Sequence, residues 1–166
     1  GGMGALWVAR HLGLGSPLVV KLLDPQFAHD ENYRIRFERE ARASAALRSP
    51  HIVHVHDYGI HEQIPFIAME LLEGEDLGQR LRRVRRFSIP DTWKLLVQIA
   101  KGLRRAHEAG IVHRDLKPAN LFLARTDDDE VLKILDFGIA KETNPLSEAT
   151  KAGEMVGSPH YMSPEQ

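Results

Sequence analysis

The sequence contains no cysteine, and this absence excludes a disulfide scaffold, a thiolate zinc site and a cysteine nucleophile. It also lacks an excess of either charge, because 22 Lys and Arg residues stand against 23 Asp and Glu residues. Such a balance gives no general attraction to nucleic acid or to an anionic membrane surface. The longest nearly uncharged stretch, residues 64–72, is interrupted by Glu70 and is far too short to span a bilayer. No basic start followed by an apolar run indicates a signal peptide.

The rest of the composition is ordinary, since 43% of the 166 residues are hydrophobic and 27% are charged, as in soluble globular proteins. This length suits one domain of usual size. The chain starts at Gly1, without an initiator Met, and ends at Gln166, where no helix or strand has finished. We therefore expect it to be a piece of a longer protein.

The first 72 residues have the pattern of a small sheet with one helix. Two apolar runs on either side of a Gly- and Pro-containing turn predict a β-hairpin over residues 5–23. Residues 30–48 have apolar side chains at helical spacing and predict a helix that ends before Pro50. Two short strands are predicted at residues 52–56 and 65–69.

The pattern changes near residues 73–75, and helices dominate from there. A short basic helix is predicted from Asp76, and a long helix between a Ser88 cap and Gly110. Short strands at residues 121–124 and 131–135 follow. The sequence therefore predicts an α+β protein whose two units meet near residue 72. The inward stripe of the long helix is predicted to consist of Trp93, Leu96, Val97, Ala100, Leu103 and His107.

Three charged residues stand where packing favours apolar side chains. Lys21 lies in an aliphatic strand, Glu40 lies on the inward face of its predicted helix, and Asp136 directly follows an apolar strand. Because burying a lone charge is costly, each needs a partner, and a Lys21–Glu40 pair is the simplest arrangement. Taken one at a time, Lys21 could point to solvent, Glu40 could lie at the edge of the stripe, and Asp136 could begin a turn.

A polar segment directly after the long helix argues against those simpler interpretations. Residues 113–120 read His-Arg-Asp-Leu-Lys-Pro-Ala-Asn, at a position where a core would need apolar side chains. Asp115 and Asn120 lie in this loop, and Asp136 follows the next pair of strands, so three oxygen-bearing side chains are expected to converge. Hard oxygen ligands in a chain without cysteine favour Mg²⁺, which proteins bind through one or two carboxylates together with substrate phosphates.

The ordered set of these motifs resembles a protein kinase, more narrowly the bacterial relatives of eukaryotic (Hanks-type) serine/threonine kinases. The set begins with a Gly-rich start, a Lys in a strand and a Glu in a helix. It continues with H-R-D-L-x-x-x-N at residues 113–120, D-F-G at residues 136–138 and S-P-E at residues 163–165 in place of A-P-E. The resemblance covers essentially the whole chain. It implies a bilobal fold, with an N-lobe at residues 1–72 that lacks its first strand and a partial C-lobe at residues 73–166.

The resemblance also implies an activity, the ATP-dependent transfer of the γ-phosphate to serine and threonine hydroxyls of proteins. Asp115 matches the catalytic aspartate that orients the substrate hydroxyl and accepts its proton. Lys117 would steady the transferred phosphoryl group. Lys21, held by Glu40, matches the lysine that binds the α- and β-phosphates of ATP.

Two further sets of positions follow from the same resemblance. The Mg²⁺ ligands match Asn120 and Asp136. In the nucleotide pocket, the glycine loop matches Gly1, Gly2 and Gly4, and the two residues over the adenine match Leu6 and Val19. The phosphate-binding lysine matches Lys21, and the gatekeeper matches Met69. The backbone of Glu70 and Leu72 would bond the adenine edge, so the side chains of these two residues matter little.

The chain departs from the family pattern in several places. Leu6 replaces the usual valine and Val19 the usual alanine, and both changes add bulk to the nucleotide pocket. The first glycine of the loop and the strand before it are missing. Glu165 matches a glutamate whose arginine partner would follow Gln166. We therefore expect the 166-residue piece, expressed alone, to be marginally stable and inactive.

Residues 139–162 match the activation segment of the family. Arg114 precedes the catalytic aspartate, which is typical of kinases that are switched on when this segment is phosphorylated, because a phosphate there can pair with the arginine. Ser158 matches a structural position. Autophosphorylation is expected at one of three hydroxyl residues, namely Thr143, Ser147 and Thr150.

Other interpretations remain open at this point. A pseudokinase scaffold and a small-molecule phosphotransferase are the alternative functions. The resemblance implies protein substrates, a kinase dimer for trans-autophosphorylation, a cytoplasmic location (or the cytoplasmic part of a membrane-anchored receptor kinase), no nucleic-acid partner and no membrane contact within this piece. A metal site among His51, His54, His56 and His61 is disfavoured because no acid or cysteine completes it. The four arginines of residues 82–86 could bind an acidic partner, although a solvated helix face is the commoner explanation.

Overall fold

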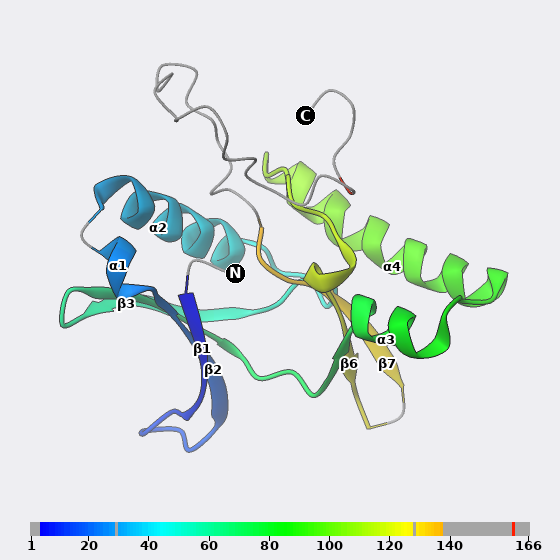
Figure 1. Ribbon diagram of the computed structural model, residues 1–166, viewed down its shortest axis with the longest axis horizontal. Coiled ribbons are helices and arrows are strands. Elements are labelled where there is room, and N and C mark those ends of the chain that lie inside the picture. The colour runs from blue at the N-terminus through cyan, green and yellow to red at the C-terminus, as the bar shows by residue number, and fades with distance from the viewer. Residues whose placement is uncertain (1–3, 29, 128, 138–160, 162–166) are drawn as a thin grey trace.

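The computed structural model describes residues 4–28, 30–127, 129–137 and 161, without the side chains of Arg36 and Glu40. Figure 1 shows two groups of elements, with the first four strands and two helices on the left and two further helices with a smaller sheet on the right. In chain order the elements are β1 (Gly4–Arg10), β2 (Pro17–Leu23), α1 (Pro25–Ala28), α2 (Glu31–Ala46), β3 (Val55–His61), β4 (Ile64–Glu70), β5 (Gly74–Asp76), α3 (Leu77–Val84), α4 (Ile89–Glu108), the 3₁₀ turn η1 (Pro118–Asn120), β6 (Leu121–Arg125) and β7 (Glu130–Ile134).

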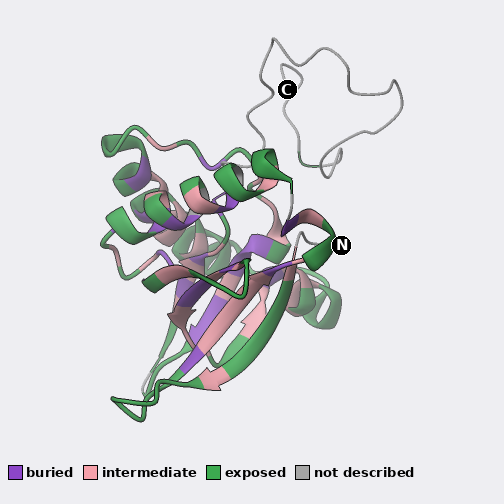
Figure 2. Ribbon diagram, turned by 90° about the vertical axis from the view of Figure 1, so that its left-hand side faces the viewer, coloured by how far each residue is buried: buried purple, intermediate pink, exposed green. Residues whose placement is uncertain are grey.

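The described strands form two antiparallel sheets. The first has the order β1-β2-β4-β3, and the second has the order β5-β6-β7. Helix α2 packs against the first sheet, where Leu23, Phe37, Ala41, Val55 and Ile67 form a buried cluster. Helix α4 packs against β7 in the second. Figure 2 shows the buried residues gathered where helices meet sheets, so each group of elements has its own core.

Side-chain caps fix where the helices begin. The Asp30 carboxylate accepts hydrogen bonds from the backbone N–H groups of Asn32 and Tyr33 at the start of α2. Asp76 caps α3 in the same way through Gln79 N–H, and Ser88 caps α4 through Asp91 N–H. These bonds satisfy donors that have no partner inside the helix. The α+β architecture and the predicted helix starts are therefore confirmed.

The predicted strand at residues 52–56 is wrong in position. Strand β3 begins only at Val55 and runs through Tyr58 and Gly59, to a two-residue turn in which Glu62 and Gln63 have φ values of 46° and 67°. Residues 52 and 53 instead run beside β7, because Ile52 forms a bridge with Ile134 and Val53 N–H donates to the Ile134 carbonyl at 3.0 Å. The segment before β3 therefore ties the first sheet to the second.

The predicted inward stripe of α4 is also wrong in part. Trp93 is 68% exposed and Leu96 is 54% exposed, whereas Gly102 and Ala106 are buried. A Cβ atom at residue 102 would lie 2.7 Å from Ile134 Cδ1 and 2.9 Å from the His51 carbonyl oxygen. The glycine lets the helix approach β7 closely, and this contact sets which face of α4 turns inward.

Candidate functional site

The loop between α4 and β6 gathers three of the predicted site residues. The Asp115 carboxylate oxygen Oδ2 lies 2.9 Å from Lys117 Nζ and accepts a hydrogen bond of 3.2 Å from Asn120 Nδ2. Asn120 Nδ2 also donates to the Asp115 backbone carbonyl at 2.8 Å. Asn120 is buried, while the side chains of Asp115 and Lys117 are 18% and 26% exposed. An acid, an amide and a cation are thus held together in the loop between α4 and β6.

A buried histidine, His113, joins this loop to the segment that follows β7. Asp115 N–H donates to its Nδ1 at 3.3 Å, so the ring proton lies on Nε2, which donates to the Leu135 carbonyl at 2.9 Å. The ring also packs on Phe137 with 4.9 Å between centroids. Because the histidine contacts the residues on both sides of Asp136, it fixes the Asp115 loop and the Asp136 segment relative to each other.

Two residues of this region adopt positive φ values that non-glycine residues seldom adopt. Arg114 has a φ of 59° and Asp136 a φ of 42°. Arg114 directly precedes Asp115, whose N–H donates to His113. Asp136 directly follows Leu135, whose carbonyl accepts from His113 and whose N–H donates to the Asn120 carbonyl at 2.9 Å. Strained backbone of this kind persists where surrounding contacts over-determine it, and such positions cluster at functional sites.

Lys21 reaches this region from the other sheet. Its Nζ donates to Asp136 Oδ1 at 2.9 Å, and the two side chains are 14% and 51% exposed. The structure therefore brings Lys21 and Asp136 together across 115 residues of sequence. The predicted Lys21–Glu40 pair lies outside the described residues, because the Glu40 side chain is not described.

Five of the residues predicted to bind the nucleotide lie on one face of the first sheet, whereas Glu70 pairs with Leu18 and lies on the other face. Directly opposed residues of antiparallel strands share a face, and the register pairs Leu6 with Lys21 and Val19 with Met69. Because alternate residues of one strand also share a face, Gly4 joins this set. Leu72 follows β4 by two residues and is partly buried. Gly1 and Gly2 lie outside the described residues.

A magnesium ion is implied by the resemblance, and the side chains present fit it. Both donor hydrogens of Asn120 Nδ2 are directed at Asp115, which leaves the amide oxygen Oδ1 as the atom that could bind a cation. Asp136 supplies a half-exposed carboxylate, and carboxylate and amide oxygens are suitable Mg²⁺ ligands. In the part of the chain that the structure describes, no three His, Cys, Asp or Glu side chains are grouped so as to hold a metal by themselves.

The structure adds a contact that sequence reasoning missed. The Glu70 carboxylate oxygen Oε1 accepts a hydrogen bond from Lys133 Nζ at 2.7 Å and another from His54 N–H at 2.7 Å. Lys133 lies on β7 and Glu70 ends β4, so the Glu70 side chain links the end of β4 in the first sheet to β7 in the second. A single lysine among the apolar residues of β7 is the only sequence signal for this contact, and it does not indicate the partner.

Several predicted positions cannot be placed. The candidate phosphorylation sites Thr143, Ser147 and Thr150 lie outside the described residues, as do Ser158 and Glu165. Among the described residues, no helix is both long enough and apolar enough to cross a bilayer.

Comparisons with known proteins identify the family to which the chain is similar. The family model described as the protein kinase domain matches residues 1–166. The serine/threonine-protein kinase pkn3 of Myxococcus xanthus is 41% identical over 171 residues, which are all of this chain and 31% of that protein. The serine/threonine-protein kinase PknA of Mycobacterium tuberculosis is 39% identical and is covered over 39% of its length. The chain thus spans between 31% and 39% of the length of these two curated relatives.

A solved structure gives the same picture of the fold. The crystal structure of the Mycobacterium tuberculosis PknI kinase domain superposes with a TM-score of 0.72 and 33% sequence identity, over 84% of this chain and 56% of that chain.

Proposed function

Because the chain belongs to the protein kinase family, with bacterial serine/threonine kinases among its relatives, we propose that its residues transfer the γ-phosphate of ATP to serine or threonine hydroxyls of proteins. The single observation that supports this best is the convergence of Lys21 with Asp136 and of Lys117 and Asn120 with Asp115. Phosphoryl transfer depends on alignment and charge neutralisation more than on covalent chemistry, and this cluster supplies both.

In the proposed reaction the oxygen of the substrate hydroxyl attacks the γ-phosphorus, and the bond from that phosphorus to the β-phosphate oxygen breaks. Asp115 holds the hydroxyl and accepts its proton, and ADP leaves. Lys117, at 2.9 Å from the Asp115 carboxylate, neutralises charge on the transferred group. Lys21 binds the α- and β-phosphates, and for this its ammonium group must leave the Asp136 carboxylate and bind the nucleotide instead.

Asn120 and Asp136 would hold Mg²⁺, which supplies charge neutralisation of the phosphates when bound. The protein's own contribution is to orient these ligands. His113 does so for the segment around Asp136, since it holds the Leu135 carbonyl, and Asp115 does so for the Asn120 amide.

The domain organisation follows the two sheets. We place the boundary between an ATP-binding N-lobe and a substrate-binding C-lobe near residue 72, between β4 and β5. The same proposal includes protein substrates, autophosphorylation within a dimer and a cytoplasmic location for this part of the chain.

The test is Asp115→Asn in the full-length protein, with radiolabelled ATP, Mg²⁺ and a serine-containing protein substrate. Loss of the general base lowers the rate of phosphate transfer by about 10²–10⁴-fold, while the amide keeps the hydrogen-bonding shape of the carboxylate. Asp127→Asn is the matched control, because Asp127 is an exposed acid in the β6–β7 turn, and its rate should equal that of the unchanged protein.

A pseudokinase scaffold predicts a different result. A scaffold would keep its biological effect in the Asp115→Asn variant and would transfer no label in either form. A small-molecule phosphotransferase would label a soluble acceptor and leave the protein substrate unlabelled. Either outcome would reject the proposed function.

A further inference from the structure

Two histidines that the phosphate-transfer cluster does not use lie next to each other at the edge of the first sheet. His54 directly precedes β3 and His56 lies in it, and β3 is an outer strand in the sheet order. Both side chains are exposed. Their ring centroids are 4.9 Å apart, and the ring planes are perpendicular. The two imidazoles therefore form one solvent-facing pair.

A β-bulge lies at this position. Val55 and Asp57 of β3 oppose consecutive residues of β4, so His56 is the extra residue between them. Bulges change the direction of a side chain and are frequent next to functional sites. Here the ring of the extra residue contacts the His54 ring, while Val55, between the two histidines in sequence, is buried.

The backbone of His54 is held in place without the help of its ring. Its carbonyl accepts a hydrogen bond from Glu70 N–H at 3.0 Å, and its N–H donates to the Glu70 carboxylate at 2.7 Å. No hydrogen bond joins the ring of His54 or of His56 to another described residue. The ring nitrogens are therefore available to a ligand on a backbone that is already fixed.

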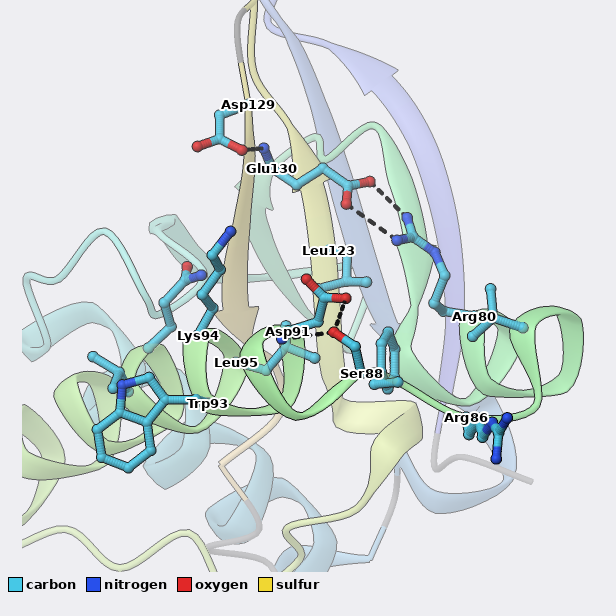
Figure 3. A pocket seen from close by; sticks show the side chains of 14 residues that line it. Arg80, Arg86, Ser88, Asp91, Trp93, Lys94, Leu95, Leu123, Asp129 and Glu130 are labelled. Carbon is cyan, nitrogen blue, oxygen red and sulfur yellow. Dashed lines mark hydrogen bonds and ion pairs between the residues drawn. The ribbon is translucent and has the colours of Figure 1, made fainter.

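The groove between α3, α4 and the β6–β7 hairpin differs in this respect, because its acids have partners within the protein (Figure 3). Glu130 accepts two hydrogen bonds from the Arg80 guanidinium, at 2.6 Å and 3.1 Å, and this pairing raises the pKa of Arg80 above its ordinary value. Asp91 accepts from the Ser88 hydroxyl. A ligand there would have to replace these bonds, whereas a ligand of the histidine pair would not.

The spacing of the two rings suits a shared metal ion. An imidazole nitrogen lies about 2.0–2.1 Å from a bound Zn²⁺, and two imidazoles on one tetrahedral or square ion then have ring centroids roughly 5 Å apart. The observed separation is 4.9 Å. Exposed side chains change rotamer within nanoseconds, so the rings can turn one nitrogen each toward the same point while the backbone stays in place.

The chemistry of the pair selects the kind of ion. Imidazole nitrogen suits Zn²⁺, Ni²⁺ and Cu²⁺, whereas Mg²⁺ prefers oxygen ligands. The neighbouring carboxylates of Asp57 and Glu70 already accept hydrogen bonds, from Tyr58 N–H at 2.8 Å and from Lys133 at 2.7 Å. In the described part of the chain no three His, Cys, Asp or Glu side chains are grouped so as to hold a metal, so water would complete the coordination.

We propose that His54 and His56 chelate one divalent transition-metal ion of the class that imidazole prefers, namely Zn²⁺, Ni²⁺ or Cu²⁺. The proposal does not require the closed four-ligand zinc site that the sequence disfavours. It is also separate from the Mg²⁺ ligands proposed at Asn120 and Asp136, because those ligands are oxygens. An ion that binds the folded pair stabilises the folded protein by mass action.

The direct test is a titration of the metal-free full-length protein with Cu²⁺ in excess Mg²⁺, followed by electron paramagnetic resonance. His54→Gln and His56→Gln each remove one imidazole, and each should raise the Kd for Cu²⁺ at least about tenfold, because the second ligand no longer acts within the same molecule. The spectrum of the unchanged protein minus that of His54→Gln isolates this site from any other. Its hyperfine pattern should show two nitrogen ligands.

His61→Gln is the matched control, because His61 is exposed at the other end of β3. This variant should leave the Kd for Cu²⁺ unchanged. Zn²⁺ should raise the thermal unfolding temperature of the unchanged and His61→Gln proteins, and it should raise that of His54→Gln and His56→Gln less. Without metal all these proteins should unfold at the same temperature, because the contacts of His54 with Glu70 use its backbone.

Three results would overturn the metal site. They are equal Kd values for the His54→Gln and His61→Gln proteins, a difference spectrum with one nitrogen ligand, and displacement of Cu²⁺ by Mg²⁺. If one of the two histidine variants does not fold, the other still decides the outcome. These measurements use no ATP and no protein substrate, so the metal site and the proposed kinase function can each fail while the other stands.

Discussion

The two groups of elements are joined in two places that differ in kind. On the side of the Asp115 loop, which we call the cleft junction, the described residues include the ion pair of Lys21 with Asp136, whose side chain is half exposed. On the connecting side, Val53 N–H donates to the Ile134 carbonyl, Ile134 N–H donates to the His51 carbonyl, and the Glu70–Lys133 pair adds a charge-assisted bond. Ile52 and Ile134 are almost fully buried between them.

The two junctions therefore differ in the free energy that is needed to break their contacts. An ion pair with one half-exposed partner is screened by solvent on that side and contributes less to stability than a buried contact, so a charged ligand can displace Asp136 from Lys21 at small cost. The backbone hydrogen bonds beside the buried isoleucines are more costly to break, because breaking them exposes apolar surface to water and leaves polar groups without partners. We infer that the cleft junction serves function and the connecting junction serves the fold, and the predictions below test that division.

The largest effect is expected at the cleft junction. Lys21→Met keeps the length of the side chain and removes its charge, so the nucleotide phosphates lose a fixed cation. The rate of phosphate transfer should fall by about 10²–10³-fold, as when one preorganised group that stabilises charge is removed. Thermal unfolding of the same variant should stay close to that of the unchanged protein.

Lys101→Met is the control for this variant, because Lys101 is exposed on α4 and makes the same change in composition. It should alter neither the rate nor the unfolding temperature. A Lys21→Met protein that unfolds many degrees lower would show that the cleft pair is part of the fold, and the division between the two junctions would then be wrong.

The next effect is expected where α4 approaches the connecting junction. Gly102→Ala places a methyl group 2.7 Å from Ile134 Cδ1 and 2.9 Å from the His51 carbonyl oxygen, closer than real contacts allow. Overpacking of this kind costs about 1–3 kcal/mol of stability, which denaturant unfolding measures. Gly13→Ala is the matched control, since its nearest described neighbour, His11, lies at an ordinary 3.5 Å. Equal midpoints for the two variants would contradict the close approach.

The sequence predicted much of the site because its signals are local. The polar loop at residues 113–120 and the carboxylate of Asp136 stand out from their apolar surroundings, and the structure places Asp115, Asn120 and Lys117 in contact. Helix starts were predictable for the same reason, since Asp76 and Ser88 bond to N–H groups three residues away.

Contacts between distant segments were not predictable in this way. The residues around Trp93 do not indicate that α4 packs through the face that contains Gly102. That close approach depends on Ile134, which lies 32 residues after Gly102 in the sequence. The partner of Glu70 was equally hidden, since a lysine in a strand usually faces water. Periodicity gives a helix its apolar face only approximately, and the neighbouring element decides the rest.

The smallest effect is expected for the Glu70–Lys133 pair, which tests the connecting junction most finely. Lys133→Met leaves a partly buried carboxylate that still accepts from His54 N–H, so the loss of stability should be about 1 kcal/mol. Glu70→Gln alone should cost a similar amount, and the double variant should cost less than the sum, because the two residues contact each other. Denaturant unfolding of the four proteins gives the coupling directly. Strict additivity would mean that the pair does not link the two sheets, and the connecting junction would then depend on its backbone bonds and buried isoleucines alone.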